Sequence, residues 1–141
     1  MTNRTFAIIK PDAVKNNFSG KIISQILKSE FKILSAKYIK MTKNQANGFY
    51  GIHIDKPFFE ELTNFMSSGP SWVLALEKEN AVEEWRKIIG ATNPADADEG
   101  TIRKLYASSI GENAVHGSDN DKNAAIEIGF FFSEAELIAS Q

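Results

Sequence analysis

Short apolar runs separated by helical patterns dominate this chain. Residues 5–9 and 72–76 are apolar runs bounded by turn-forming residues, which indicates buried β-strands. Residues 33–41 alternate between two faces as a strand does, although neither face is wholly apolar. Residues 114–116 favour a short last strand that ends at His116. The pattern therefore predicts four strands.

Apolar positions three or four residues apart predict helices between these strands. Residues 19–30 show this spacing. A second stretch begins near Pro57, a residue type that favours the first helical position, and ends at Gly69. A third ends at Gly90, because glycine commonly terminates helices. A last helix is expected over residues 121–132.

Smaller features complete the expected fold. Residues 42–45 and 80–83 have the form of helix-capping boxes, and residues 133–136 are expected to cap a final turn. Within the last long helix, we expect Ala125, Ile128 and Phe132 to be buried. Strands adjacent to helices, but few in number, indicate an α+β sandwich in which one small sheet is covered by helices.

Composition limits the class of protein. The chain has 141 residues, so residues 1–141 fit one domain with a real core. A net charge of −2 argues against bulk binding of nucleic acid or membrane. The absence of cysteine excludes disulfides, thiolate metal sites and cysteine nucleophiles. Residues 1–5 do not resemble a signal peptide, and no apolar run approaches the roughly 20 residues of a membrane span.

His116 is the candidate nucleophile. It is one of two histidines and lies among small and turn-forming residues, followed by Gly117 and Ser118, so a bulky reactant can approach it. Free imidazole has a pKa of about 6.5, which leaves much of it unprotonated and nucleophilic at neutral pH. A surface-turn histidine without a role is the alternative. We read the other histidine, His53, as structural or solvated.

Several cations could bind phosphates. Lys10 directly follows a strand, and Pro11 fixes the turn after it. Arg86 and Arg103 have guanidinium groups that match phosphate oxygens, and Thr92 offers a hydroxyl at a turn. Taken singly, the lysine could be solvated and the arginines could form surface ion pairs. A P-loop and a dinucleotide-binding fingerprint are absent.

Candidates for a metal ion and for a base are fewer. Asp12, Asp119 and Asp121 could serve a metal or could cap helices. Two histidines and no cysteine are too few ligands for a protein-held zinc, whereas Mg²⁺ held mainly by substrate phosphates remains compatible. Phe58 follows Pro57 at the expected start of a helix, where a partly exposed ring can stack on a base.

Together these motifs resemble the nucleoside diphosphate kinase family, in its bacterial type with a short C-terminus. They occur in the family's order and spacing over essentially the whole chain. The motifs that carry the resemblance are Ile-Lys-Pro-Asp-Ala at 9–13, Phe-Tyr at 49–50, Lys-Pro-Phe-Phe at 56–59, Ser-Gly-Pro at 68–70, Gly-Ala-Thr-Asn-Pro-Ala-Asp at 90–96, Gly-Thr-Ile-Arg at 100–103 and the segment 113–119 ending in His-Gly-Ser-Asp.

The resemblance implies a ferredoxin-like fold, with a four-stranded antiparallel sheet and helices on one face. It implies transfer of the γ-phosphate of a nucleoside triphosphate to a nucleoside diphosphate, by a ping-pong mechanism through a phosphohistidine at His116. Glu127 would orient the imidazole, with Ser118 nearby, and Lys10 would assist catalysis. The residues implied at the nucleotide are Lys10, Tyr50, Phe58, Leu62, Arg86, Thr92, Arg103, Ile110 and Asn113, and Asp119 is implied near the metal.

The implied partners follow from the same resemblance. They are Mg²⁺, ATP and other nucleoside triphosphates and diphosphates including deoxy forms, and further copies of the chain in a tetramer or hexamer. We expect no membrane and no specific nucleic acid partner, and a cytoplasmic location. A non-catalytic nucleotide-binding module on the same fold is the alternative function. Glu99, Leu105 and Trp72 depart from the family pattern, which puts subunit contacts in doubt more than catalysis.

Overall fold

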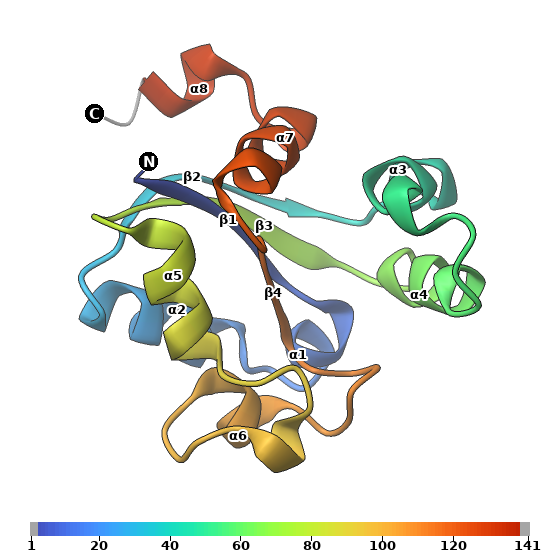
Figure 1. Cartoon of the computed structure of the whole chain (residues 1–141), viewed down its shortest axis with the longest axis horizontal. Helices are drawn as coiled ribbons and strands as arrows, with labels where there is room; N and C mark the ends of the chain where they lie inside the picture. The colour runs from blue at the N-terminus through green and yellow to red at the C-terminus, as the bar shows by residue number, and fades with distance from the viewer. Residues whose placement is uncertain (1–2, 139–141) are drawn as a thin grey trace.

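The computed structural model describes residues 3–138 and is built on one four-stranded antiparallel sheet (Figure 1). The strand order is β2-β3-β1-β4, an order that the sequence pattern did not fix. The strands are β1 (Arg4–Ile9), β2 (Lys32–Ile39), β3 (Ser71–Glu77) and β4 (Val115–Gly117). The predicted α+β class and the four predicted strands are confirmed.

Helices cover both faces of the sheet, so the expectation of helices on one face was wrong (Figure 1). The α-helices are α1 (Pro11–Lys15), α2 (Ser19–Lys28), α3 (Lys43–Phe49), α4 (Phe59–Met66), α5 (Ala81–Ile89), α6 (Ile102–Tyr106), α7 (Asp121–Phe131) and α8 (Glu134–Ile138). Two 3₁₀ turns, η1 (Gly51–His53) and η2 (Pro94–Asp96), join them. The helices α2 and α5 pack on one face, and α3, α4, α7 and α8 lie over the other.

The central strand β1 has a hydrophobic core on each side. Ala7 and Ile9 pack with residues of α2 and α5, whereas Phe6 and Ile8 pack with residues of α4 and α7. Successive side chains of a strand point to opposite faces, so a strand between two helical layers is apolar at every position. This explains why the sequence shows an uninterrupted run at this strand.

The strand β2 departs from the predicted alternation because it contains a bulge. The register with β3 shifts between Ile33 and Ser35. One extra residue reverses the facing of the residues that follow it, so Leu34 is buried within a strand whose pattern is mixed. The mixed pattern of residues 33–41 thus has a local structural cause.

Three local predictions were wrong. Helix α4 begins at Phe59, so Pro57 precedes it instead of occupying its first turn, and the helix ends at Met66. Asn80 has a left-handed backbone with φ of 55° and makes no side-chain capping bond, so residues 80–83 form no capping box. In α7 the buried residues are Ala124 and Ile128, so Ile128 is buried as predicted, whereas Ala125 is exposed. The capping box predicted at 42–45 is present, and the cap predicted at 133–136 is formed by reciprocal hydrogen bonds between Ser133 and Glu136.

The connection between α5 and β4 is largely irregular, as its weak periodicity indicates, and contains only η2 and α6. It begins at Gly90, whose φ is 86° and where a Cβ atom would lie 2.6 Å from the Thr101 hydroxyl. Glycine is therefore required for both conformation and close approach. Within residues 3–138, no helix is long and apolar enough to cross a membrane.

Candidate active site

His116 lies in the edge strand β4, opposite Ile8 of β1. Its ring packs edge-on against Phe6 and Phe49, with ring centroids 6.1 Å and 5.7 Å away. The side chain is 19% exposed, so it is neither a solvated turn residue nor sealed in the core. Contact with aromatic rings together with partial exposure suits a group that must meet a reactant.

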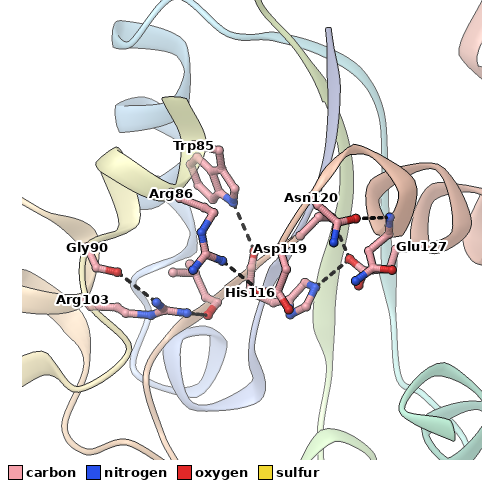
Figure 2. Close-up of polar contacts among 11 residues, drawn as sticks. Trp85, Arg86, Gly90, Arg103, His116, Asp119, Asn120 and Glu127 are labelled. Atoms are coloured by element: carbon pink, nitrogen blue, oxygen red, sulfur yellow. Dashed lines mark hydrogen bonds and ion pairs between the residues drawn. The ribbon is translucent and has the colours of Figure 1, made fainter. Parts of the chain in front are cut away.

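A carboxylate of α7 holds the imidazole (Figure 2). Glu127 Oε1 lies 2.8 Å from His116 Nε2 and accepts a 2.7 Å hydrogen bond from the Ser118 hydroxyl. One carboxylate oxygen thus serves both groups, which fixes the ring's orientation. The structure brings together the three residues that the sequence grouped here.

The backbone of His116 is fixed as well. Trp85 of α5 donates its indole N–H to the carbonyl oxygen of His116, at 3.2 Å (Figure 2). A Cβ atom on Gly117 would lie 2.9 Å from the Trp85 ring and 3.0 Å from Ile89, so only glycine permits this approach. Nothing in the sequence pattern around Trp85 reveals a hydrogen bond to a residue 31 positions away.

Arg103 is a buried cation and not a surface ion pair. Its two terminal nitrogens donate to the carbonyl oxygens of Gly90 and Val115, both at 3.0 Å (Figure 2). Burial, and then the nearby charge of Arg86, lower the pKa of Arg103 to about 10. Within the described residues its Nε has no hydrogen-bond partner. The guanidinium group is therefore held rigidly, and its Nε–H donor has no acceptor among the described residues.

Arg86 forms the ion pair that the alternative interpretation expected. It lies 3.0 Å from Asp119, and both side chains are largely exposed (Figure 2). Such an exposed pair contributes roughly 0–1 kcal/mol to stability. The pair nevertheless places a cation and a carboxylate beside the strand that carries His116.

Lys10 is also buried, so the alternative interpretation of it as a solvated lysine at the end of a strand was wrong. Only 8% of the residue is exposed, and its ammonium donates to the Asn113 side-chain oxygen at 2.8 Å. Asn113 in turn donates to the Thr92 carbonyl oxygen at 3.2 Å. Burial and then the charge of Arg103 lower the pKa of Lys10 to about 8, which the charge of Asp12 opposes.

Tyr50 closes the buried side of this region. Its ring packs edge-on against Phe49, which contacts His116. In the described part of the chain, its buried hydroxyl has no hydrogen-bond partner. Burial, and secondly the charge of Glu127, raise the pKa of Tyr50, so the group remains a neutral donor.

The three predicted base contacts lie farther out. Phe58 is 48% exposed, and its ring contacts His53 with centroids 5.5 Å apart. Ile110 is 59% exposed in the segment before β4, and Leu62 is partly buried against the core. Exposed apolar side chains are available for stacking. The polar contacts described above do not include these three residues.

The three candidate aspartates lie in different surroundings. Asp12 accepts a 3.1 Å hydrogen bond from the backbone N–H of Ala114, across 102 residues of sequence. Asp119 pairs with Arg86, and Asp121 begins α7 after the capping residue Asn120. Residues 3–138 contain no cluster of three potential metal-ligating side chains. The sequence offered Asp12 only for a metal or a helix cap, and it did not identify Trp85 as a neighbour of the site.

Comparison with known proteins identifies the family. The sequence model for nucleoside diphosphate kinase matches residues 3–137. Proteins named nucleoside diphosphate kinase from Geotalea uraniireducens and Flavobacterium psychrophilum are 57% and 58% identical to the chain. Both alignments cover 96% of this chain, and 98% and 97% of the respective relatives.

Solved structures agree. The nucleoside diphosphate kinase of Aquifex aeolicus superposes with a TM-score of 0.94 at 39% identity, covering 96% of this chain and 99% of that one. The Halobacterium salinarum enzyme, solved with CDP, gives 0.91 at 35% identity, covering 96% and 91%. These likenesses confirm the ferredoxin-like fold and give no support to a non-catalytic module. The chain is an enzyme and belongs to the nucleoside diphosphate kinase family.

Proposed function

We propose that His116 carries the phosphate between two nucleotides, through its Nδ1 atom. The hydrogen bond with Glu127 engages Nε2, which leaves Nδ1 for attack on the γ-phosphorus of a nucleoside triphosphate. The P–O bond to the diphosphate breaks as the P–N bond forms, and a second diphosphate later takes the phosphoryl group. This ping-pong order lets one site serve donor and acceptor in turn.

Glu127 and Ser118 support this step. A carboxylate at Nε2 fixes the tautomer that has its proton on Nε2, and it stabilises the positive charge that develops on the ring. The Ser118 hydroxyl holds the same carboxylate oxygen, so the carboxylate itself is oriented. The observation that carries the proposal is this Glu127–His116 contact on a side chain that remains partly exposed.

Cations near His116 bind the phosphates in the proposal. Phosphoryl transfer depends chiefly on positioning and on stabilising charge on the phosphate oxygens. Lys10, Arg86 and Arg103 supply positive charge, and the free Tyr50 hydroxyl and the unused Arg103 Nε supply donors. Thr92 and Asn113 complete the set of polar groups that we assign to the phosphates and ribose.

A base lies against Phe58 in this proposal, with Leu62 and Ile110 lining the same slot. All three side chains are apolar, and the exposed Phe58 ring offers a stacking surface. None of them can read a base edge by hydrogen bonding. The proposed substrates are therefore ATP and the other ribo- and deoxyribonucleoside triphosphates and diphosphates.

Mg²⁺ is the metal that we assign to the reaction. Magnesium is commonly bound through one or two carboxylates together with substrate phosphates. The exposed Asp119 carboxylate, beside Arg86, fits an indirect role of this kind. When bound, the ion would neutralise phosphate charge. Glu127 and Ser118, and not the ion, would orient the His116 nucleophile.

Assembly is the last part of the proposal. The strand β2 is an edge strand, and Tyr38 on it is 55% exposed. Exposed edges with apolar side chains favour pairing with another chain. We assign a homo-oligomer, a tetramer or hexamer, in the cytoplasm, with residues 1–141 as one domain. Light scattering on the wild type and on Tyr38→Asp tests the assembly.

The test of the transfer step is direct. Incubation with γ-labelled ATP should place label on the wild-type protein, and addition of unlabelled nucleoside diphosphate should remove it as labelled triphosphate. A phosphohistidine is acid-labile and base-stable, which separates it from phosphoserine. Label that does not pass to the diphosphate would contradict the ping-pong order.

A further inference from the structure

Ala114, two residues before His116, has a strained backbone. Its φ is 70°, and the Val115 N–H donates to the Asn113 carbonyl oxygen at 2.8 Å. A hydrogen bond between residues two apart, around a central residue of positive φ, is a γ-turn of the rare, strained kind. Ala114 carries a Cβ atom and is fully buried, so its surroundings must hold this conformation.

The segment after β1 holds both polar groups of Ala114. The Lys10 N–H donates to the Ala114 carbonyl oxygen at 2.8 Å. The Ala114 N–H donates to Asp12 Oδ2 at 3.1 Å. Asp12 lies in the first turn of α1 and is 6% exposed. A turn at the end of one strand thus fixes the turn before the neighbouring strand.

This contact lies between the groups that handle the phosphate. Asn113, on one side of Ala114, accepts a hydrogen bond from the Lys10 ammonium. Val115, on the other side, accepts one from Arg103 and is followed by His116. A rotation at Ala114 would therefore move the nucleophile relative to both cations. Burial raises the pKa of Asp12, and the Ala114 N–H and the Lys10 charge oppose that effect.

We propose that Asp12 is a positioning residue for phosphoryl transfer, whose carboxylate holds Ala114 in its left-handed conformation and so sets His116 against Lys10 and Asn113. The inference rests on the proposed role of His116. Asp12 itself does not touch the reacting atoms. Its side chain acts through the backbone, which distinguishes it from the residues assigned to substrate.

The test is the single-turnover rate of His116 phosphorylation, measured at neutral pH, below the pKa of Lys10. Asp12→Ala leaves the Ala114 N–H without an acceptor and should slow phosphorylation by about ten-fold or more. Asp12→Asn keeps an oxygen acceptor and should stay within about three-fold of the wild type, because the hydrogen bond is retained. Asp12→Asn that is as slow as Asp12→Ala would overturn the inference.

A second background tests the backbone itself. Glycine adopts positive φ at little cost, so in an Ala114→Gly protein the loss of the Asp12 carboxylate should cost only about three-fold, relative to Ala114→Gly alone. An equal loss in both backgrounds would show that Asp12 does not act through Ala114. If Asp12→Ala fails to fold, Asp12→Leu keeps the branched shape and carries the same expected loss.

Two controls complete the design. Ile26→Val, in the buried face of α2, should lower the melting temperature with the phosphorylation rate within about two-fold of the wild type. Unlabelled wild-type protein would refute the proposed function as a whole. If the wild type is labelled and Asp12→Ala is phosphorylated at the same rate, only the role of Asp12 is refuted.

Discussion

Glu127 Oε1 and His116 Nε2 lie 2.8 Å apart, between α7 and β4. The contact determines which ring nitrogen can react. It also links the edge strand β4 to a helix that packs on β1, so the nucleophile is braced by the core.

Glu127→Gln should slow His116 phosphorylation by about ten-fold or more, because each ~1.4 kcal/mol of lost transition-state stabilisation is ten-fold in rate. A neutral amide stabilises the developing imidazolium less than a carboxylate does. Single-turnover labelling measures this rate. Glu136→Gln, in α8 and paired with Lys37, is the matched control and should label like the wild type. An unchanged rate in Glu127→Gln would remove Glu127 from the mechanism.

Tyr50→Phe should separate stability from activity. The hydroxyl is buried, and no other described residue satisfies it, so its removal relieves a penalty of about 1–3 kcal/mol. The melting temperature should stay level or rise, while kcat/KM falls because a donor to phosphate is lost. Thermal unfolding and steady-state kinetics on the same preparation measure both. A drop in stability with unchanged kcat/KM would mean that Tyr50 is purely structural.

Deprotonation of Lys10 should lower kcat/KM at alkaline pH. Its pKa of about 8 means that the ammonium is present below that pH and is lost as pH rises through it. We expect kcat/KM to fall above about pH 8, and kcat to fall at higher pH because bound phosphates stabilise the charged form.

Unfolding does not explain that decline. Between a folded pKa of about 8 and the ordinary 10.5, the unfolded chain binds more protons at Lys10, so this group's contribution to stability increases with pH. Lys10→Arg remains charged, so its kcat/KM should no longer fall near pH 8, even if its activity is lower. If kcat/KM of Lys10→Arg still falls near pH 8, the decline belongs to another titrating group.

Base specificity should be broad and sugar specificity strict. Phe58, Leu62 and Ile110 are apolar, and stacking contributes roughly 1–3 kcal/mol for any base. We also expect Lys10 and Asn113 to contact the 3′-hydroxyl, and an analogue without that hydroxyl would leave these polar groups unpaired. ADP, GDP, CDP, UDP and 2′-deoxy forms should all react, and 3′-deoxy forms far more slowly. The measurement is kcat/KM for each member of this panel. Acceptance of only one base would contradict the proposed base site at Phe58, Leu62 and Ile110.

Local chemistry explains what the sequence could predict. The apolar run of β1, the Thr42 capping box and the small residues after His116 each show their role within a few positions. Lys10 and Arg103 were candidates by residue type, but their burial was not predictable because it depends on the packing of distant segments. The strand order was hidden for the same reason.

Long-range polar contacts account for most of the rest. The hydrogen bond from Ala114 to Asp12 and that from Trp85 to His116 join residues far apart in sequence. Neither side chain occupies a distinctive local pattern: Trp85 fits an amphipathic helix, and Asp12 fits the first turn of a helix. The bulge in β2 likewise depends on its pairing with β3.

In the proposed reaction, His116 is the phosphate carrier. The decisive measurement is the amount and site of label after incubation of wild type, His116→Ala and His53→Ala with γ-labelled ATP. Wild type and His53→Ala should carry acid-labile, base-stable label on the Nδ1 atom of His116, and His116→Ala should carry none while still binding nucleotide. Label retained by His116→Ala, or found at another residue of the wild type, would contradict the account.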